Sequence, residues 1–270
     1  MNCNICNGSM HIKFENQTDI NFNVTSKIFN WFECEKCGML AISPLFNETE
    51  ELNKYYSNYQ PHAGGLHIAR SLSFVDKISI NIRAIQKTHD VNSTMKIIDL
   101  GCGKGDMLVN ISNHFPNAEL YGLDYNISPV KENLTGYPVT LFEGGLDVVD
   151  SSYKFDYILS SQLLEHLERP QDYIDFIKEH SHTETIILTD IPNLDSRTYK
   201  AYQDKWVHLD TPRHRNHFSK KSLHILFNEY TLTNFREFGT NHAFITSFCL
   251  KHCLKTNDKR FIIRFRNYIL

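Results

Sequence analysis

The stretch 95-MKIIDLGCGKGDML-108 decides the fold of this 270-residue chain. Residues 95–100 form an apolar run with β-branched side chains, which is typical of a strand buried in a parallel sheet. A glycine-rich turn follows at 101–105, and a helical pattern begins at Asp106. A strand, a glycine turn and a helix in this order let a ligand approach the backbone at the helix N-terminus. We therefore expect an α/β sheet with a ligand site at the end of this strand.

An acidic residue after the next apolar segment narrows the kind of ligand. Asp124 ends the segment 118-AELYGLD-124, where a carboxylate can accept hydrogen bonds from both hydroxyls of a ribose. Nicotinamide enzymes share that acid, but their fingerprint is G-x-G-x-x-G, and here the third glycine comes one residue early, at Gly105. The turn and the acid indicate a nucleoside, and the segments downstream decide which one.

Two further segments complete the pattern. Residues 154–174 are expected to form a strand ending in Ser160 and Ser161, then a short helix with Glu165-His166, and residues 183–193 a fifth strand. In order and spacing, the chain now resembles the class I S-adenosylmethionine-dependent methyltransferases over roughly residues 92–250. The matching motifs are IDLGCGKG (98–105), LDYN (123–126), FDYILSSQLLEHLERP (155–170) and IPN (191–193). The resemblance implies an α/β fold with a Rossmann-like seven-stranded sheet and helices on both faces.

The same resemblance implies how the cofactor S-adenosyl-L-methionine is held. The glycine turn would lie against the methionine part, Asp124 would bind the ribose, and Asp99 would reach the amino group directly or through water. The end of the fourth strand would line the sulfonium. Many family members bind adenine with a Gly-Asp pair after the third strand, but here Gly144-Gly145 stands there and Asp147 is displaced by two. The expected cofactor-binding residues are Asp99, Gly101, Cys102, Gly103, Gly105, Asp124, Tyr125, Gly145, Leu146, Ser160, Ser161 and Gln162.

Two cysteine pairs open the chain. Cys3-x-x-Cys6 and Cys34-x-x-Cys37 have the spacing of zinc ligands, and short strands are expected between them. Because cysteine fills all four positions, no site stays open for water, so a structural Zn²⁺ in a small zinc ribbon over residues 1–42 is expected. Four unlinked reduced cysteines, or a redox pair, are the alternatives.

The remaining domain boundaries follow from composition. Residues 43–91 are expected to form a helical connector or lid, with a helix start near Asn47 and an amphipathic helix over residues 67–90. The methyltransferase domain is placed at 92–254, and residues 255–270 are expected to be a C-terminal tail.

A histidine-rich loop, 206-WVHLDTPRHRNHFS-219, lies in an insertion over residues 193–217 at the edge where parallel sheets bind ligands. It is the expected substrate face, with Trp206, Arg213, Arg215 and Tyr59 as substrate-binding residues. A metal site (His208, Asp210, His214, His217), an anion clamp (Arg213, Arg215), a general base and satisfied structural histidines all remain open. The candidate bases are His214, then His217 and His208, with His166 as a further candidate.

Composition and charge limit the classes of function and the location that are expected. The net charge is −3, which argues against non-specific nucleic-acid binding, and no run of 18 apolar residues exists. The N-terminus lacks a secretory pattern, so a cytoplasmic location is expected.

The expected activity is methyl transfer from S-adenosylmethionine to a small-molecule acceptor. A hydroxyl of a sugar, nucleotide-linked or phosphorylated metabolite in surface-polysaccharide (capsule) tailoring is the leading hypothesis for the acceptor. An RNA methyltransferase or a nucleic-acid-binding module that uses the ribbon is the alternative. The oligomeric state is not readable from the sequence.

Overall fold

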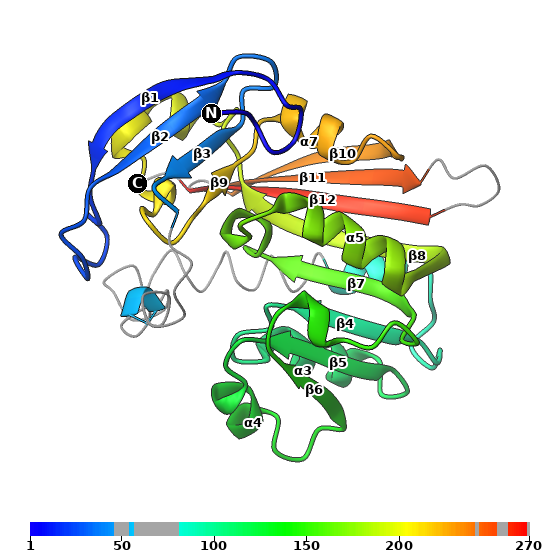
Figure 1. The fold of residues 1–270 in the computed structure, drawn as a ribbon. Coiled ribbons are helices and arrows are strands. Elements are labelled where there is room, and N and C mark those ends of the chain that lie inside the picture. Colours follow the sequence, from blue (N-terminus) through cyan, green and yellow to red (C-terminus); the bar gives the residue numbers. More distant parts are fainter. Residues whose placement is uncertain (46–53, 57–80, 241–242, 253–258, 269–270) are drawn as a thin grey trace.

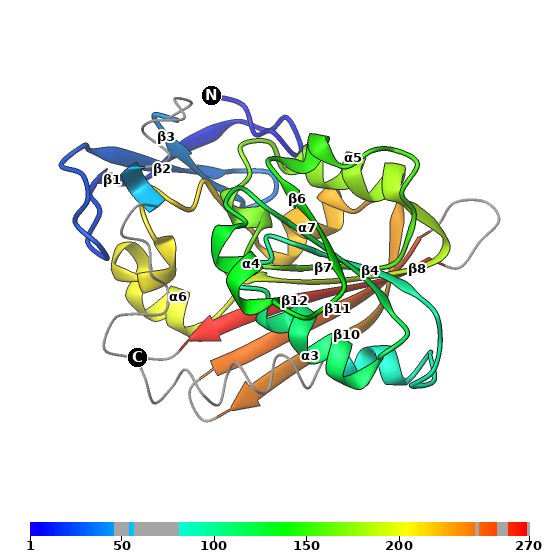
Figure 2. The same cartoon turned by 90° about the horizontal axis from the view of Figure 1, so that it is seen from below.

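The computed structural model of the chain describes residues 1–45, 54–56, 81–240, 243–252 and 259–268. Two sheets organise it (Figure 1): an eight-stranded sheet with the order β10-β11-β12-β8-β7-β4-β5-β6, and a four-stranded sheet with the order β1-β2-β3-β9. Figure 2 shows that the smaller sheet lies beyond the end of the larger one toward which β12 points. The two sheets meet at the edge where the expected ligand site lies.

Five parallel strands form the part of the large sheet that the sequence predicts. Their order is β6-β5-β4-β7-β8, and every neighbouring pair among them is parallel. The strands are β4 (Lys96–Leu100), β5 (Glu119–Asp124), β6 (Val139–Glu143), β7 (Phe155–Ser161) and β8 (Ser181–Pro192). All residues of β4 after Lys96 are buried, which confirms the strand expected from the apolar run.

Helices cover both faces of this sheet, as the resemblance implies. Ile98 and Leu100 of β4 pack in one core with α5 (Pro170–His180) and α7 (Lys220–Leu226). Ile97, whose side chain points the opposite way, packs in a second core with α3 (Asp106–His114) and α4 (Ser128–Asn133). The alternation of side chains along a strand produces this split.

Three further strands extend the sheet beyond β8. They are β10 (Tyr230–Thr240), β11 (Ala243–His252) and β12 (Lys259–Tyr268). β12 runs parallel to β8, and β11 is antiparallel to both β12 and β10. The sheet therefore has eight strands rather than the expected seven. Within the expected tail, Lys259–Tyr268 form β12. The aromatic and β-branched sequence FIIRF (261–265) explains the strand.

The small sheet joins two segments that are far apart in the sequence. β1 (Met10–Gln17), β2 (Phe29–Cys34) and β3 (Leu40–Ser43) form an antiparallel meander. Its fourth strand, β9 (Asn216–His217), comes from the histidine-rich loop and pairs with β3. We call β1–β3 with their connecting turns, residues 1–43, the N-terminal sheet. The sequence did not predict that the loop would complete it.

Short elements fill the connections. The 193–217 insertion holds α6 (Arg197–Tyr202) and the 3-10 turns η3 (Gln203–Lys205) and η4 (Val207–Leu209). The turns η1 (Leu146–Val148) and η2 (Leu164–His166) follow β6 and β7.

Much of the expected connector lies outside the described residues. This holds for the cap at Asn47, for Tyr59 and for the first part of the helix expected over 67–90; the part at 81–86 is helical, with Ile82 and Ile85 buried. No helix in the described ranges combines the length and apolarity needed to cross a bilayer.

Candidate functional site

The glycine turn forms a pocket-like bend of backbone at the carboxyl end of β4. Gly101, Gly103 and Gly105 have φ angles of 70°, 58° and 77°, which glycine adopts without the strain that a Cβ brings. The backbone N–H groups of Gly101 and Cys102 donate to the carbonyl oxygen of Leu123 at 2.8 and 3.0 Å. A Cβ built on Gly103 would meet no heavy atom within 4 Å. The turn is therefore fixed on its inner side and open on its outer side.

Asp124 is joined directly to this turn. Its Oδ2 accepts a hydrogen bond from the Gly103 N–H at 2.9 Å, and its Oδ1 accepts one from the Asn126 N–H at 3.2 Å. Burial raises the pKa of the Asp124 carboxyl, against the effect of these donors. Because each carboxylate oxygen has two lone pairs, both retain capacity to accept a hydrogen bond from a ribose hydroxyl.

The residues expected near adenine lie together beside Asp124. The Gly144 N–H donates to the Asp124 carbonyl at 3.0 Å. A Cβ built on Gly145 would lie 3.4 Å from Tyr125 Oη and 2.7 Å from Asp147 Oδ1, and Tyr125 is 67% exposed. The carboxylate of Asp147 thus lies over Gly145 although it is displaced in sequence. Leu146 is half-buried and packs against the core.

The end of β7 differs from expectation at one residue. The Ser160 hydroxyl is buried and bonds Tyr173 Oη at 2.7 Å and Thr189 Oγ1 at 2.9 Å, beneath α5. Because this hydroxyl is already engaged inside the core, it is withdrawn from the residues expected around the sulfonium.

Asp190 of β8 holds the other two residues of this segment. Ser161 Oγ donates to Asp190 Oδ2 at 3.2 Å, and Gln162 Nε2 donates to Asp190 O at 3.2 Å and Oδ2 at 3.3 Å. The sequence analysis missed Asp190, whose signal was an acid at the end of the fifth strand. Asp99 is buried within β4, and burial raises the pKa of the Cys102 thiol, which keeps it protonated.

A second group of side chains lies next to the glycine turn, across Leu163. A Cβ on Gly101 would be 3.4 Å from Leu163 Cδ1, and η2 begins at the next residue. On η2, the ring of His166 lies edge-on to that of His214, with centroids 4.6 Å apart. Glu165 is 0% exposed, and one donor atom each of Glu165, His166 and His214 lies within 4.8 Å of the others. We call these three residues the Glu-His-His cluster.

Hydrogen bonds orient the two imidazoles of the cluster. His166 Nδ1 lies 3.0 Å from the Arg213 carbonyl oxygen and 2.8 Å from Tyr56 Oη, and His214 Nδ1 lies 2.8 Å from the His208 carbonyl oxygen. Since a carbonyl oxygen only accepts, each Nδ1 carries the hydrogen and each Nε2 keeps its lone pair in the neutral ring. Burial lowers the pKa of both histidines, so both are neutral at pH 7.

Arg213 is fully buried between two carboxylates. Its Nη2 lies 2.7 Å from Asp19 Oδ1 and 2.7 Å from Asp210 Oδ1, and its Cζ lies 4.4 Å from the centre of the Phe22 ring. Burial opposes the charge on Arg213, but the two carboxylates outweigh it and raise its pKa. The guanidinium therefore ties the loop to the N-terminal sheet, and the anion clamp expected at Arg213 is wrong. Arg215, the other clamp residue, pairs with Glu168 at 2.9 Å.

Most of the other loop residues pack rather than face a substrate. Trp206 is 1% exposed, in a core with Trp31 and Leu40, which corrects its expected place on the substrate face. His217 lies in β9 against the rings of Trp31 and Trp206, at 5.0 and 5.5 Å, and burial lowers its pKa to about 3. Enclosure by both tryptophans corrects the expectation of His217 as a base. His208 contributes its carbonyl to orient His214.

The metal site expected in the loop also has a different composition. Asp210 is committed to Arg213, and His217 is turned toward the tryptophans. Of the expected four ligands, only His214 belongs to a group of donor atoms that lie together, and its partners there are Glu165 and His166.

The four cysteines meet at one end of the N-terminal sheet. Cys3 Sγ lies 3.6 Å from Cys37 Sγ, and Cys6 Sγ lies 3.4 Å from Cys34 Sγ. Four thiolates at about 2.3 Å from a tetrahedral zinc would be about 3.8 Å apart. The hydrogen bond from Cys37 lowers the pKa of Cys3 to about 5 and raises that of Cys37. A Cβ on Gly8 would come within 3.1 Å of Cys34 Sγ, so glycine is required beside the sulfurs. The geometry fits the expected zinc.

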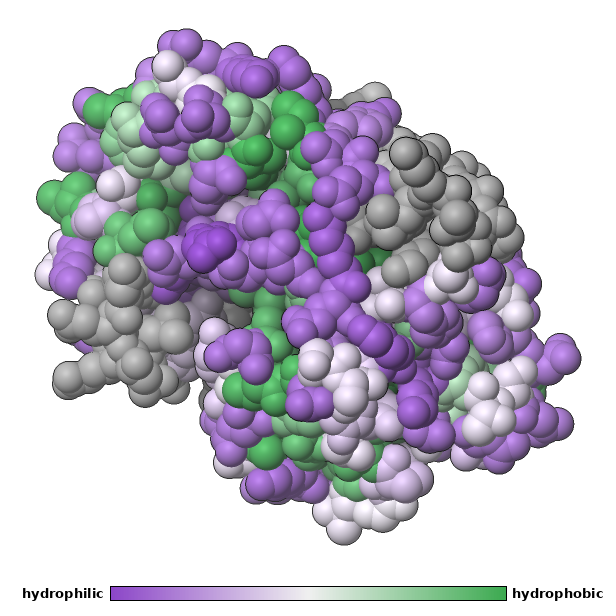
Figure 3. All heavy atoms as spheres, turned by 45° about the vertical axis from the view of Figure 1, so that its right-hand side comes forward, coloured by the Kyte–Doolittle hydropathy of each residue, from purple (hydrophilic) through white to green (hydrophobic). Residues whose placement is uncertain are grey.

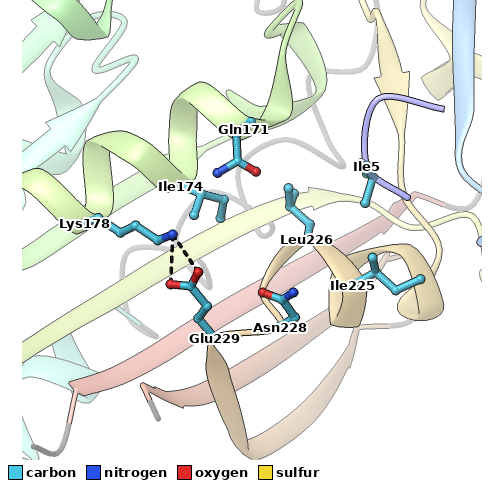
Figure 4. A pocket seen from close by; sticks show the side chains of 8 residues that line it. All are labelled: Ile5, Gln171, Ile174, Lys178, Ile225, Leu226, Asn228 and Glu229. Atoms are coloured by element: carbon cyan, nitrogen blue, oxygen red, sulfur yellow. Dashed lines mark hydrogen bonds and ion pairs between the residues drawn. The ribbon is translucent and has the colours of Figure 1, made fainter. Parts of the chain in front are cut away.

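A separate cavity of about 200 Å³ lies between α5, α7 and Ile5 (Figure 4). The ion pair between Lys178 and Glu229 closes one side of it, at 2.8 Å. None of the expected site residues lines this cavity. On the face drawn in Figure 3, polar and apolar residues are mixed in the upper part of the molecule, and apolar residues also lie near the centre of the view.

Known proteins resemble the chain over the region of the glycine turn. The profile of a family described as "Methyltransferase domain" matches residues 77–237, more than half of the chain. A trans-aconitate 2-methyltransferase of Deinococcus radiodurans is 26% identical over 174 residues, which are 63% of this chain and 59% of that protein. A malonyl-[acyl-carrier protein] O-methyltransferase of Bacillus anthracis is 20% identical over 153 residues, 53% of this chain and 56% of that protein. The chain thus spans less than two thirds of either relative.

A solved structure supports the fold. A protein of Nostoc punctiforme described as an O-methyltransferase superposes with a TM-score of 0.52 at 19% identity, over 63% of this chain and 55% of that chain. The likeness confirms the α/β architecture that the glycine turn predicted.

Proposed function

The chain belongs to the methyltransferase domain family, and from this premise we propose that it transfers a methyl group from S-adenosylmethionine to an oxygen atom of a small-molecule acceptor. The cofactor supplies a methyl group activated on a sulfonium. The protein must then hold donor and acceptor in line and exclude competing water.

The observation that carries the proposal is the bond between Asp124 and the glycine turn. Its 2.9 Å hydrogen bond with the Gly103 N–H fixes an acid for the ribose beside a backbone bend that is open on its outer side. Asp99, Ser161 and Gln162 would border the methionine end, and Tyr125, Gly145 and Asp147 the adenine end. Ser160 leaves the expected set because its hydroxyl is engaged in the core, and Asp147 joins it.

On the acceptor side, we assign the proton-accepting group to His166 before His214. Both rings keep an Nε2 lone pair, but His166 is half-buried whereas His214 is 4% exposed. An acceptor hydroxyl can therefore reach His166 more easily, and His214 packs behind it. This order reverses the one expected from the sequence.

The acceptor class follows from which groups are available. Arg213 is enclosed by two carboxylates and Arg215 is paired, so these positions offer no grip for a phosphate. The two named relatives carry carboxylate-bearing compounds in their names, trans-aconitate and malonyl, and none of the reported relatives is named for a sugar or a capsule. We propose a small hydroxyl- or carboxylate-bearing acceptor and give up the phosphorylated one.

We also propose a structural Zn²⁺ on Cys3, Cys6, Cys34 and Cys37. The paired sulfur distances support it, and so does the close approach of Gly8, where a Cβ would lie 3.1 Å from Cys34 Sγ. With four thiolates and no vacant position, this ion would have no part in methyl transfer.

Calorimetry with S-adenosylhomocysteine, the demethylated cofactor, tests the proposal. Wild-type protein should bind it, and Asp124→Ala should weaken binding about 100-fold or more, because a charge-assisted hydrogen-bonding group is lost. Asp150→Ala, an exposed acid after η1, serves as the matched control and should bind normally. A wild-type protein that ignores both forms of the cofactor at millimolar concentration would refute the proposed function.

A further inference from the structure

We propose that the Glu-His-His cluster binds a divalent transition-metal cation. The donor atoms of Glu165, His166 and His214 lie within 4.8 Å of one another, on two segments brought together by the fold. Two imidazoles and one carboxylate form a ligand set that holds zinc, manganese or iron in proteins and leaves coordination positions open.

The hydrogen bonds of the two rings supply a second, independent argument. A metal-binding histidine usually donates its other ring N–H to a carbonyl or carboxylate, which fixes the ring and makes the free nitrogen more basic. His166 and His214 both do so, through Nδ1 to the carbonyls of Arg213 and His208. Both Nε2 lone pairs are thereby left for a cation.

Backbone hydrogen bonds hold the segment that supplies the carbonyls of Arg213 and His208. The Arg215 N–H donates to the Glu165 carbonyl at 2.7 Å, and the His214 N–H donates to the Asp210 carbonyl at 3.1 Å. The Arg213 guanidinium then anchors the same loop between Asp19 and Asp210. The ring orientation is therefore built into the fold rather than set by a flexible loop.

Ligand distances allow the three residues to close on one ion. Donors about 2.1 Å from a tetrahedral cation are about 3.4 Å apart. The donor atoms lie within 4.8 Å of one another, so they would have to approach one another by about 1.4 Å at most.

The position of the cluster indicates what the cation would do. Leu163 bridges the Gly101 turn and η2, so the ion would lie beside the place where the cofactor's reactive end is proposed. Its open positions, on the half-buried side of His166, would bind an oxygen of the acceptor and lower the pKa of its hydroxyl. With the cation bound, this effect would take the place of the proton-accepting role given to His166, whose Nε2 would then be a ligand. This part of the inference rests on the proposed function; binding of the cation does not.

The two metal sites differ in chemistry, which makes them separable. The cysteine cluster offers four soft sulfur donors, which prefer zinc, whereas the Glu-His-His cluster offers nitrogen and oxygen donors that accept manganese. Protein loaded with one zinc ion per chain, which the four thiolates take first, therefore leaves the second site to report on added Mn²⁺.

Electron paramagnetic resonance of free Mn²⁺, titrated with the full chain, is the test. Wild-type protein should bind one Mn²⁺, and Glu165→Gln and His166→Asn should each weaken binding by about tenfold or more. The matched control is His114→Asn on α3, whose Nδ1 also faces a backbone carbonyl, that of Asn110 at 2.8 Å, but which belongs to no donor group among the described residues. This control should bind Mn²⁺ as the wild type does.

Calorimetry with S-adenosylhomocysteine on the same samples separates the two proposals and checks that each variant is folded. A wild type that binds the nucleoside but no Mn²⁺ at millimolar concentration overturns the metal site and leaves the proposed function standing. Variants that bind Mn²⁺ as tightly as the wild type also overturn it. Protein that binds Mn²⁺ at this cluster but never the nucleoside overturns the proposed function instead.

Discussion

The candidate site has two halves that are built in different ways. The cofactor half is the glycine turn at 101–105 with Asp124, and the acceptor half is the Glu-His-His cluster with the loop that carries His214. The cofactor half joins segments that adjoin in the sheet, and its main contact, between Gly103 and Asp124, spans 21 residues of the chain. The acceptor half depends on contacts between the N-terminal sheet and the histidine-rich loop, which are far apart in the sequence. Arg213 meets Asp19 across 194 residues, and Trp31 donates to Thr211 across 180.

This difference teaches that the acceptor half cannot keep its shape alone. β9 pairs with β3 of the N-terminal sheet, and Ser219 Oγ donates to the Cys37 carbonyl at 2.8 Å, directly beside the cysteine cluster. The N-terminal sheet therefore acts as the support of the acceptor half, while the cofactor half has its own strands and helices.

Removal of the proposed zinc should give the largest effect, because structural zinc sites contribute about 10–16 kcal/mol of apparent binding free energy. Both tryptophans of the chain, Trp31 and Trp206, are buried where the N-terminal sheet meets the loop. Chelation should shift their fluorescence to the red while affinity for S-adenosylhomocysteine is largely kept. If affinity for S-adenosylhomocysteine falls together with the fluorescence shift, the cofactor half depends on the N-terminal sheet as well, and the two halves are not separable.

Arg213→Met should come next in size. It leaves Asp19 and Asp210 buried without their cation, which costs about 3–5 kcal/mol of unfolding free energy. Arg169→Met is the matched control, since the side chains of Arg169 and its partner Asp172 are 68% and 47% exposed, and such a pair contributes about 1 kcal/mol or less. Denaturant unfolding followed by tryptophan fluorescence measures both; equal losses would contradict the structural role given to Arg213.

Two alanine substitutions in the glycine turn sharpen the picture of the cofactor half. Gly103→Ala and Gly105→Ala each force a left-handed backbone on alanine, at about 1–2 kcal/mol. Only at Gly105 would the new methyl group press on Val130 and Leu134, at 3.2 Å. Thermal unfolding should therefore rank Gly105→Ala as the less stable. Gly103→Ala should lose more nucleoside affinity, because its methyl group points to the open side.

Lowering the pH, which protonates Asp19, should have the smallest effect on stability. Burial opposes ionisation of Asp19, but Arg213 outweighs it and lowers its pKa. A carboxyl with a lowered pKa stabilises the folded state above its unfolded pKa of about 3.9 and loses that contribution as the pH falls further. Wild type should thus be more stable than Asp19→Asn at pH 6, and their melting temperatures should converge below about pH 4. A constant difference at all pH values would contradict the ion pair.

The sequence predicted the strand, the glycine turn and the helix of the cofactor half because their signals are local, and cofactor binding there stays a prediction. The buried run in β4, the glycine turn and Asp124 follow each other in a fixed order, and backbone geometry requires each of them. It did not predict the buried Arg213, since charge and spacing alone do not reveal that Asp19 would enclose it. Neither Asp190 nor Glu165 has a sequence signal for its position in the site. The pairing of β7 with β8 brings Asp190 to Gln162, and the fold brings Glu165 close to His214. The place of β12 escaped prediction because strand pairing across such a separation has no local signal.

The pairing of β9 with β3 has a consequence for how the polypeptide folds as it is synthesised. The four cysteines of the cluster have emerged once residue 37 is made, so zinc can be captured early. The edge of β3 gains its partner strand, and the Asp19 carboxylate gains its cation, only with residues 213–217. Until then the nascent chain carries an unpaired strand edge, which is prone to wrong association. Truncations that stop short of residue 217 should consequently aggregate, and neither unit is a suitable fragment for separate expression.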